Sequence, residues 1–243
     1  HICDECFGPL DTVYDYDRIE LTPNSFRGRV KSLWRYIELL PLNDPDKAVD
    51  LGAGFTPLQK SIGLGERLGL KNLFIKNDSV NPSFSFKDRP ATVAVSKSLE
   101  FNLNAVGCPS TGNLAAATAA HAARAQLPCY IFVPSDIEPN KIVQASAYGA
   151  QVVAVKGTYD DANRMLTQAA DMYKIGVVNV NIRSYYVEGS KTLGFEVAEQ
   201  LGWKAPDHVI VPTASGALLC AIKKGFDELV KVGLLDDCNT KIT

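Results

Sequence analysis

The chain has 243 residues, of which 46% are hydrophobic and 21% are charged, a composition typical of a globular protein with one large or two modest domains. Lysine and arginine number 25 against 27 aspartate and glutamate, a net charge of -2, so neither nucleic acid nor an anionic membrane is expected as a partner. No apolar run approaches the roughly 20 residues of a membrane helix, and the first residues lack a signal-peptide pattern. We therefore expect a cytoplasmic protein that binds no nucleic acid and no membrane.

The two ends of the sequence resemble the ends of a fragment. Cys3 and Cys6 form a Cys-x-x-Cys pair, but the second pair that would complete a zinc ribbon is absent from the sequence. These cysteines are weak metal candidates only, and no metal site is predicted. The chain opens on His1 and stops at Thr243, where a new extended segment is expected to begin. We expect both ends to be truncated.

The residue pattern predicts an α/β fold. Residues 10–16 are expected to form a short strand, and residues 27–40 carry apolar side chains at helical spacing. From residue 73 onward, apolar strands alternate with helices, which predicts parallel-type sheets covered by helices on both faces. The predicted strands are residues 73–76, 105–108, 130–133, 152–155, 177–179 and 208–211, and the predicted helices are residues 88–99, 113–125, 140–148, 160–173, 188–201 and 216–230. Such sheets bind ligands beyond the carboxyl ends of their strands, so functional residues are expected in the loops that follow these strands.

A lysine flanked by aromatic residues stands in the loop after the first of these strands. The stretch 81–90 reads Asn-Pro-Ser-Phe-Ser-Phe-Lys-Asp-Arg-Pro and contains Lys87. A lysine in water stays protonated to about pH 10, but apolar walls or a cationic neighbour disfavour its charge and make the amine a better nucleophile. Phe84 and Phe86 are placed to supply the walls, and Arg89 the cationic neighbour. Lys87 is therefore a candidate for covalent chemistry.

The same residues allow a structural interpretation. Ser85 and Asp88 have the spacing of a capping box, which would make Lys87 a solvated lysine in the first turn of a helix. Pro90 places the start of that helix near Lys87 or Asp88, because proline is tolerated only in a first turn. This stretch by itself leaves both interpretations open.

A second loop follows the next predicted strand and opens an alanine-rich helix. It reads Pro-Ser-Thr-Gly-Asn over residues 109–113. The free N–H groups of a helix N-terminus, with the hydroxyls of Ser110 and Thr111, suit a carboxylate, and Asn113 adds an amide donor. Simple N-capping by either hydroxyl is the alternative. His121, in the middle of that helix, is interpreted as a packed or surface residue rather than a catalytic one.

A third loop, Pro-Thr-Ala-Ser-Gly-Ala-Leu over residues 212–218, again joins a strand to a helix. Its small residues leave the backbone open to a phosphate, although Gly216 alone is weak evidence and a tight connection without function is the alternative. Parallel strands can bring all three loops to one edge of a sheet. An amine, a carboxylate site and a phosphate site together describe pyridoxal phosphate held by a lysine, with an amino-acid substrate beside it.

Three motifs carry a resemblance to a known family. They are Asn-Pro-Ser-x-Ser-Phe-Lys-Asp-Arg from Asn81, Ser-Thr-Gly-Asn from Ser110, and Glu-Gly-Ser-Lys-Thr-Leu-Gly-Phe-Glu from Glu188. Over nearly the whole chain the sequence resembles the threonine synthases, which are fold-type II pyridoxal-phosphate enzymes of the tryptophan synthase β-subunit superfamily. Asp88 after the lysine favours this family over the threonine dehydratases. The resemblance implies pyridoxal 5′-phosphate as cofactor and conversion of O-phosphohomoserine and water to threonine and phosphate.

The resemblance also implies a role for each loop. Lys87 would form a Schiff base with the cofactor and move protons between substrate carbons, and Asn113 would hydrogen-bond the cofactor's O3′. Ser110 and Thr111 would hold the substrate carboxylate, and Ser83 would also lie on the substrate side. The cofactor phosphate would bind the backbone of Thr213, Ala214, Ser215, Gly216, Ala217 and Leu218.

The sequence departs from the family pattern in ways that concern the substrate. Phe84 stands where many relatives have glycine, and Ala214 and Ala217 replace usual glycines, which alanine can do only where φ is negative. Tyr186 stands where many threonine synthases place an arginine for the substrate phosphate, and Arg183 is the candidate substitute. Two alternatives therefore stay open: an enzyme acting on O-phosphoserine, such as a cysteate synthase, and a catalytically silent ligand-binding homologue.

The resemblance further implies a division into domains. Residues 1–26 would form an N-terminal segment with half of a possible zinc ribbon. Residues 27–95 and 182–243 would form a large cofactor-binding domain, incomplete at its C-terminus and without the family's partner for the pyridine nitrogen. Residues 96–181 would form a small α/β domain that closes over the substrate. A homodimer is a further expectation from the family.

Overall fold

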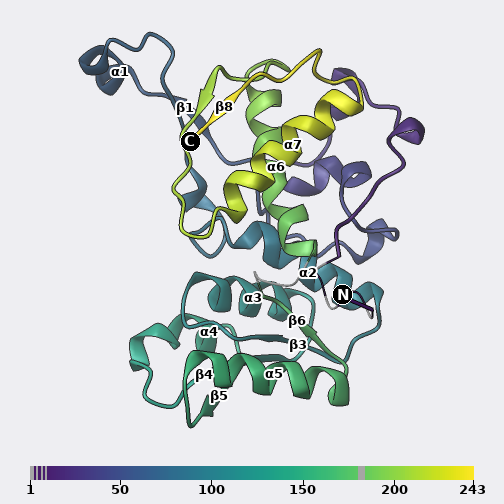
Figure 1. The fold of residues 1–243 in the computed structure, drawn as a ribbon, viewed down its shortest axis with the longest axis vertical. Helices are drawn as coiled ribbons and strands as arrows, with labels where there is room; N and C mark the ends of the chain where they lie inside the picture. Colours follow the sequence, from purple (N-terminus) through teal and green to yellow (C-terminus); the bar gives the residue numbers. More distant parts are fainter. Residues whose placement is uncertain (1–2, 4, 7, 9, 180–183) are drawn as a thin grey trace.

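The structure is a computed structural model that describes residues 3, 5–6, 8, 10–179 and 184–243. Figure 1 shows two parts, one above the other, with helix α2 (Asp88–Glu100) running between them. The lower part contains a four-stranded sheet, and the upper part is built mainly from helices. Across the described ranges, no helix combines the length and the apolar character that crossing a membrane requires.

The four-stranded sheet is entirely parallel and has the order β5-β4-β3-β6. Every residue of the inner strand β3 is buried, as expected for a strand covered on both faces. Helices α3 and α4 lie on one side of the sheet and α5 on the other (Figure 1). The bounds are Ala105–Cys108 (β3), Cys129–Pro134 (β4), Gln151–Val155 (β5), Ile175–Val177 (β6), Asn113–Arg124 (α3), Val143–Ala147 (α4) and Tyr159–Tyr173 (α5). The predicted parallel sheet covered by helices is confirmed here.

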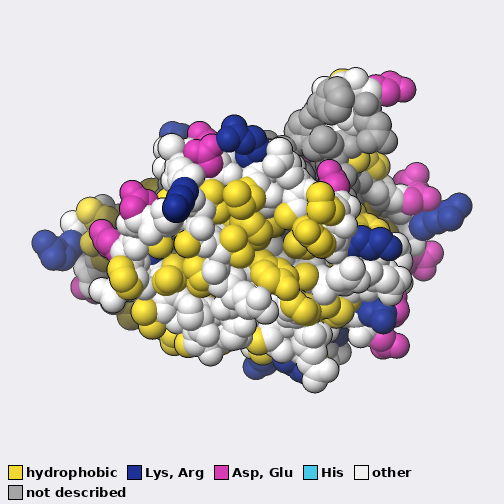
Figure 2. Space-filling model, turned by 90° about the horizontal axis from the view of Figure 1, so that it is seen from below, with side chains coloured by type: hydrophobic (Ala, Val, Ile, Leu, Met, Phe, Trp, Pro, Cys, Tyr) yellow, Lys and Arg dark blue, Asp and Glu magenta, His cyan; other side chains and the backbone are white. Residues whose placement is uncertain are grey.

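The lower part also exposes apolar surface. Figure 2 views the molecule from below and shows apolar side chains gathered across that face. A shallow groove beside α5 is lined by Tyr130, Phe132, Val153, Ala169 and Ile175 together with their neighbours. The single helix α5 therefore leaves part of this side of the sheet uncovered.

The upper part is organised around two helices, α6 (Ser184–Gln200) and α7 (Ala217–Lys231). Glycines allow close approach: a Cβ on Gly225 of α7 would lie 2.4 Å from the carbonyl oxygen of Lys191 on α6, and one on Gly189 of α6 would lie 2.1 Å from that of Arg89 on α2. The short strands β1 (Leu58–Lys60) and β2 (Phe74–Lys76) pair antiparallel around α1 (Ile62–Leu68), and β7 (His208–Val209) pairs parallel with β8 (Lys241–Ile242). Single turns of 3₁₀ helix span Tyr16–Arg18, Pro23–Phe26, Pro45–Lys47, Asp78–Val80 and Pro139–Lys141.

Two predicted elements of the N-terminal region are wrong. Residues 10–16 form no strand, because Tyr14 and Tyr16 instead direct their hydroxyls to Glu188 and Glu228 on the two large helices. The segment predicted as a helix over residues 27–40 is a kinked 3₁₀ helix, Leu33–Leu39.

The guanidinium of Arg35 explains the second difference. Arg35 is buried and donates hydrogen bonds to the carbonyl oxygens of Phe26 and Val30 at 3.0 and 2.8 Å, and to the Glu199 carboxylate at 2.6 Å. These bonds require the chain before Arg35 to fold around its side chain, which a regular α-helix over the same residues would not permit.

Other boundaries differ by less, and two differences matter. The strand predicted over residues 73–76 exists, but it belongs to the antiparallel pair and not to the parallel sheet. Helix α6 begins at Ser184 instead of residue 188, which places Tyr186 in its first turn. The division into 1–26, 27–95 with 182–243, and 96–181 stays a prediction.

Candidate active site

Lys87 immediately precedes α2 and presents its amine to an aromatic pocket. Its Nζ lies 4.3 Å from the ring centroid of Phe86 and 5.0 Å from that of Tyr186, and it donates a hydrogen bond to the Tyr186 hydroxyl. Burial lowers the pKa of the Lys87 amine, with Cys108 at the end of β3 as an opposing influence. Lys87 therefore has the partly desolvated surroundings that covalent amine chemistry needs.

Two of the three residues expected to create those surroundings do not do so. Phe84 has a φ of 64° and a side chain that is 74% exposed, so it points into solvent instead of walling the amine. Arg89 is completely buried and its guanidinium is engaged by carboxylates, so its charge is compensated where it lies. The pKa of Lys87 is lowered by burial, and Phe86 with Tyr186 form the pocket.

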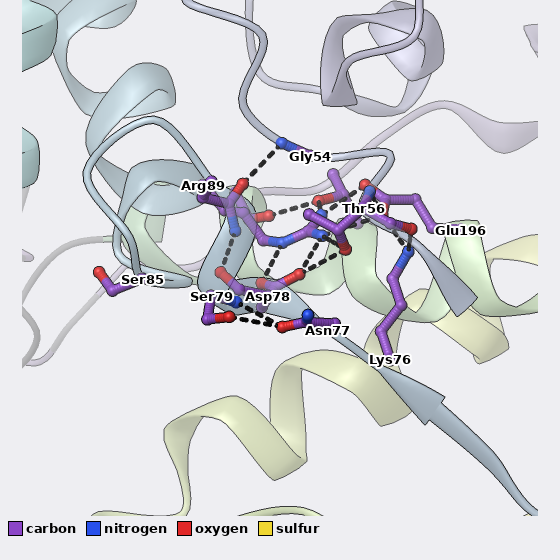
Figure 3. Close-up of polar contacts among 12 residues, drawn as sticks. Gly54, Thr56, Lys76, Asn77, Asp78, Ser79, Ser85, Arg89 and Glu196 are labelled. Carbon is purple, nitrogen blue, oxygen red and sulfur yellow. Dashed lines mark hydrogen bonds and ion pairs between the residues drawn. The ribbon is translucent and has the colours of Figure 1, made fainter. Parts of the chain in front are cut away.

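The guanidinium of Arg89 is the centre of a buried charge network (Figure 3). It donates to Asp78 at 2.7 Å and to both carboxylate oxygens of Glu196 at 2.5 and 2.9 Å. Lys76 reaches the same Glu196 carboxylate at 2.7 Å and the Thr56 carbonyl oxygen at 2.6 Å. Burial opposes the charge of Glu196, but Arg89 and Lys76 outweigh it and lower its pKa. The network joins the start of α2, directly after residues 83–88, which we call the lysine turn, to the end of β2 and the C-terminal half of α6.

The capping box predicted from Ser85 and Asp88 does not form. The Asp88 carboxylate instead accepts the backbone N–H and the hydroxyl of Ser83, both at 2.8 Å, while the Ser85 hydroxyl accepts the backbone N–H of Lys87 at 3.2 Å. The other carboxylate oxygen of Asp88 lies 3.1 Å from Nε2 of His121 on α3. Because a carboxylate only accepts hydrogen bonds, Nε2 carries the hydrogen of this bond.

His121 is therefore a packed residue, as expected, but it also has a specific partner beside Lys87. Its side chain is completely buried, and its Nδ1 has no hydrogen-bond partner among the described residues. Gln144 of α4 adds a second tie to this turn through the Ser83 carbonyl oxygen at 3.5 Å. The lysine turn is thus followed directly by Arg89 of the charge network, and it is hydrogen-bonded to His121 and Gln144 on two helices of the lower part.

The loop over residues 109–113 begins directly after Cys108, so the topology places it beside Lys87. The N-cap residue of α3 is Gly112, without a side-chain hydrogen bond, and the Ser110 hydroxyl accepts the N–H of Gly112 at 3.3 Å. Neither hydroxyl caps the helix, so the interpretation as simple N-capping is wrong. Asn113 is exposed and Thr111 is partly exposed, which leaves both side chains accessible to a ligand.

The loop over residues 212–218 ends at a second helix N-terminus without a side-chain cap. Gly216 precedes α7 with a φ of 77°, which glycine adopts at little cost, and a Cβ there would have no atom within 4 Å. Ala214 and Ala217 are absent from the residues with positive φ, so the alanines meet the condition that their positions impose. The Thr213 hydroxyl donates to the Val211 carbonyl oxygen at 2.9 Å. The loop is largely exposed, with backbone N–H groups available to an anion.

Two side-chain pairings at this site were not predicted from the sequence. The pairing of Tyr186 with Lys87 and that of His121 with Asp88 join residues far apart in the chain, and the one available signal was a polar side chain on an otherwise apolar helix face. Arg183 lies outside the described residues. Cys3 and Cys6 are free thiols, and within the described part of the chain no group of three or more metal-binding side chains occurs.

The sequence comparison assigns the class of protein that this fold and site define. Residues 49–241 match the family model described as pyridoxal-phosphate dependent enzyme, and the chain belongs to that family. The residues present fit its cofactor, because they supply a partly desolvated amine and two helix N-termini without side-chain caps. Lys87 would hold the cofactor's carbonyl carbon, and the loop before α7 its phosphate.

The relatives found by sequence are threonine synthases. The chain is 42% identical to threonine synthase of Methanocaldococcus jannaschii over 236 residues, covering 96% of this chain and 58% of that relative. It is 38% identical to threonine synthase of Methanosarcina acetivorans over 237 residues, covering 97% of this chain and 58% of that relative. The chain therefore spans somewhat less than three fifths of the length of these relatives.

Solved structures support the fold. The processed form of threonine deaminase isoform 2 from Solanum lycopersicum superposes with a TM-score of 0.65 at 23% identity, covering 88% of this chain and 60% of that one. Maize serine racemase gives a TM-score of 0.64 at 22% identity, covering 76% of this chain and 55% of that one. At these identities the likeness concerns the architecture alone.

Proposed function

We propose that the chain carries the cofactor-binding machinery of a threonine synthase, which converts O-phosphohomoserine and water to threonine and phosphate. The observation that carries this proposal is Lys87, whose partly buried amine lies in an aromatic pocket formed by Phe86 and Tyr186. The uncapped N-termini of α3 and α7 are available for the anionic groups of cofactor and substrate. The threonine synthases at 42% and 38% identity support the choice within the family.

The residues would divide the work as follows. Bound pyridoxal phosphate supplies an electron sink that makes the substrate's carbon-bound hydrogens acidic. Lys87 takes up and returns these protons at Nζ, because its lowered pKa keeps a neutral amine accessible. The N-terminus of α3, with Ser110 and Thr111, holds the substrate carboxylate, and Asn113 orients the cofactor ring.

Two residues have narrower roles in this proposal. The Ser83 hydroxyl and N–H both bind Asp88, so Ser83 acts by fixing the lysine turn on the substrate side, rather than by a free hydroxyl. The backbone from Thr213 to Leu218 binds the cofactor phosphate. Thr213 closes this loop on its preceding strand through the Val211 carbonyl oxygen.

We also propose that residues 96–181 move as a small domain that closes over the substrate. The parallel sheet and its three helices lie within this range, in the lower part of Figure 1. The ties from His121 and Gln144 to the lysine turn would transmit that closure to Lys87.

One observation favours a second substrate. Tyr186 occupies the position of the expected phosphate-binding arginine, and its hydroxyl is engaged by Lys87. Without an arginine at this position the substrate need not be O-phosphohomoserine, and O-phosphoserine, the substrate of a cysteate synthase-type enzyme, is the second candidate.

Phosphate release and amino-acid products should be compared for O-phosphohomoserine and O-phosphoserine. We expect threonine from the first and little turnover of the second. Treatment with borohydride should fix the cofactor on Lys87 and abolish activity. A colourless protein, or label on another lysine, would contradict the proposed site, whereas label on Lys87 without turnover would indicate the catalytically silent alternative.

A further inference from the structure

The hydroxyl of Tyr186 is held against the Lys87 amine by its own packing. Tyr186 is only 3% exposed, and it belongs to the same buried core cluster as Val95 and Cys108. Its backbone carbonyl oxygen accepts the Ser190 hydroxyl at 3.1 Å, one turn further along α6. Because the ring cannot swing away without breaking this packing, the pairing with Lys87 is a built feature of the fold.

The chemistry expected of Lys87 makes a hydroxyl an apt partner. An amine that removes and returns protons alternates between a neutral form with a lone pair and an ammonium with hydrogens only to donate. A hydroxyl can donate to the first form and accept from the second. An arginine at position 186 could only donate, and its charge would repel the ammonium.

We propose that Tyr186 is a catalytic residue that pairs with the Lys87 amine in both of its protonation states. This inference rests on the proposed role of Lys87. In each step the proton passes between Lys87 Nζ and a substrate carbon, and Tyr186 keeps its own proton while its hydrogen bond reverses direction. Tyr186 therefore stabilises the amine rather than serving as the base.

The electrostatics of the pocket agree with this division of roles. Burial, with a contribution from Cys108, raises the pKa of Tyr186, so the hydroxyl stays protonated where the amine titrates. Burial lowers the pKa of Lys87, while its contacts with the rings of Phe86 and Tyr186 favour the ammonium. Among the described residues, Tyr186 and Cys108 are the titratable groups that act on the amine from other elements.

The test is Tyr186→Phe in the full chain, which keeps the ring and removes the hydroxyl. Hydrogen bonds to a charged partner are about twice as strong as neutral ones, so the loss should lower the pKa of Lys87 by about one unit. NMR of ¹³C-methylated Lys87 measures this shift without cofactor. The rate at which pyridoxal phosphate develops its yellow absorbance should shift along the pH axis by the same amount.

Tyr185→Phe is the matched control. It removes a hydroxyl from the same helical turn, but the Tyr185 ring lies against Phe101 and Lys97. If Tyr186→Phe proved unstable, 3-fluorotyrosine at position 186 would keep the packing, and its more acidic hydroxyl should change the Lys87 pKa measurably. Equal Lys87 pKa values and cofactor-uptake profiles for wild type, Tyr186→Phe and Tyr185→Phe would overturn the inference. A shifted pKa in a protein that forms no threonine would instead overturn only the proposed reaction.

Discussion

Replacing Glu196 by glutamine tests the charge network next to the lysine turn. The change is nearly isosteric, but it removes the carboxylate charge that faces two buried cations. Arg89 lies 2.5 Å from Glu196 and is fully buried, and Lys76 lies 2.7 Å away with 12% of its side chain exposed. After the change, Asp78 would be the remaining acidic partner of Arg89 among the described residues. Breaking a buried ion pair from one side costs about 3–5 kcal/mol, a large share of the about 5–15 kcal/mol that stabilises a typical protein.

A surface pair supplies the control for the same chemical change. Glu38 binds Arg29 through two bonds of 2.8 Å, but these side chains are 35% and 26% exposed. Glu38→Gln should therefore cost about 0–1 kcal/mol. Urea unfolding followed by circular dichroism measures both free energies of unfolding. Similar losses of unfolding free energy for Glu196→Gln and Glu38→Gln would refute the view that the buried ion pairs of Glu196 stabilise the fold more than a surface pair does.

The network also predicts a pH dependence. The pKa of Glu196 is lowered in the folded protein, mainly because Arg89 and Lys76 outweigh its burial. Its contribution is therefore present above the ordinary glutamate pKa of about 4.3 and is lost as the pH falls through the lowered value. The difference in unfolding free energy between wild type and Glu196→Gln should be largest near neutral pH and should shrink on acidification. A difference that grew toward low pH would contradict this sign.

Three further substitutions, two of them with a comparison variant, test the site and the packing around it. Lys87→Met should abolish borohydride labelling and should cost about 1–3 kcal/mol in unfolding free energy, because it leaves the buried Tyr186 hydroxyl without the Lys87 amine. His121→Phe should cost about 1–3 kcal/mol in urea unfolding because it leaves Asp88 short of a donor, and His121→Gln, which keeps a donor, should recover part of that loss. Gly189→Ala should cost about 1–3 kcal/mol or more because its Cβ would lie 2.1 Å from a backbone oxygen of α2. Gly63→Ala, in open space on α1, should be neutral or stabilising, and equal effects of the two alanines would contradict the close approach.

Much of the fold could be predicted because its signals are local. The start of α2 is an example, since Pro90 restricts where that helix can begin, and the structure starts it at Asp88. The uninterrupted apolar character of residues 105–108 predicted a strand buried on both faces, which β3 is. The helix after residue 27 failed for the opposite reason. Its apolar spacing was outweighed by the hydrogen bonds of buried Arg35, whose partner Glu199 lies far along the chain.

At the candidate site, too, local signals could be predicted and contacts between distant residues could not. Lys87 and the two other loops could be proposed from short motifs, because a helix N-terminus with small and hydroxyl residues is specified by adjacent positions. The surroundings of Lys87 were predicted incorrectly, because side-chain direction depends on tertiary partners. Arg89 is drawn away by Glu196, 107 positions further along, and Phe84 turns outward on a backbone with positive φ.

The sequence by itself determined the α/β class, and it singled out Lys87 and two further strand-to-helix loops as candidates, since these follow from hydrophobic period and from residues adjacent in the chain. Only the tertiary structure decided which side chains touch that lysine. Tyr186 lies 99 positions away, and α6 brings its hydroxyl to Lys87. His121 reaches Asp88 because α2 and α3 pack together. Such contacts arise when buried polar groups satisfy one another across elements, a requirement that local sequence patterns do not encode.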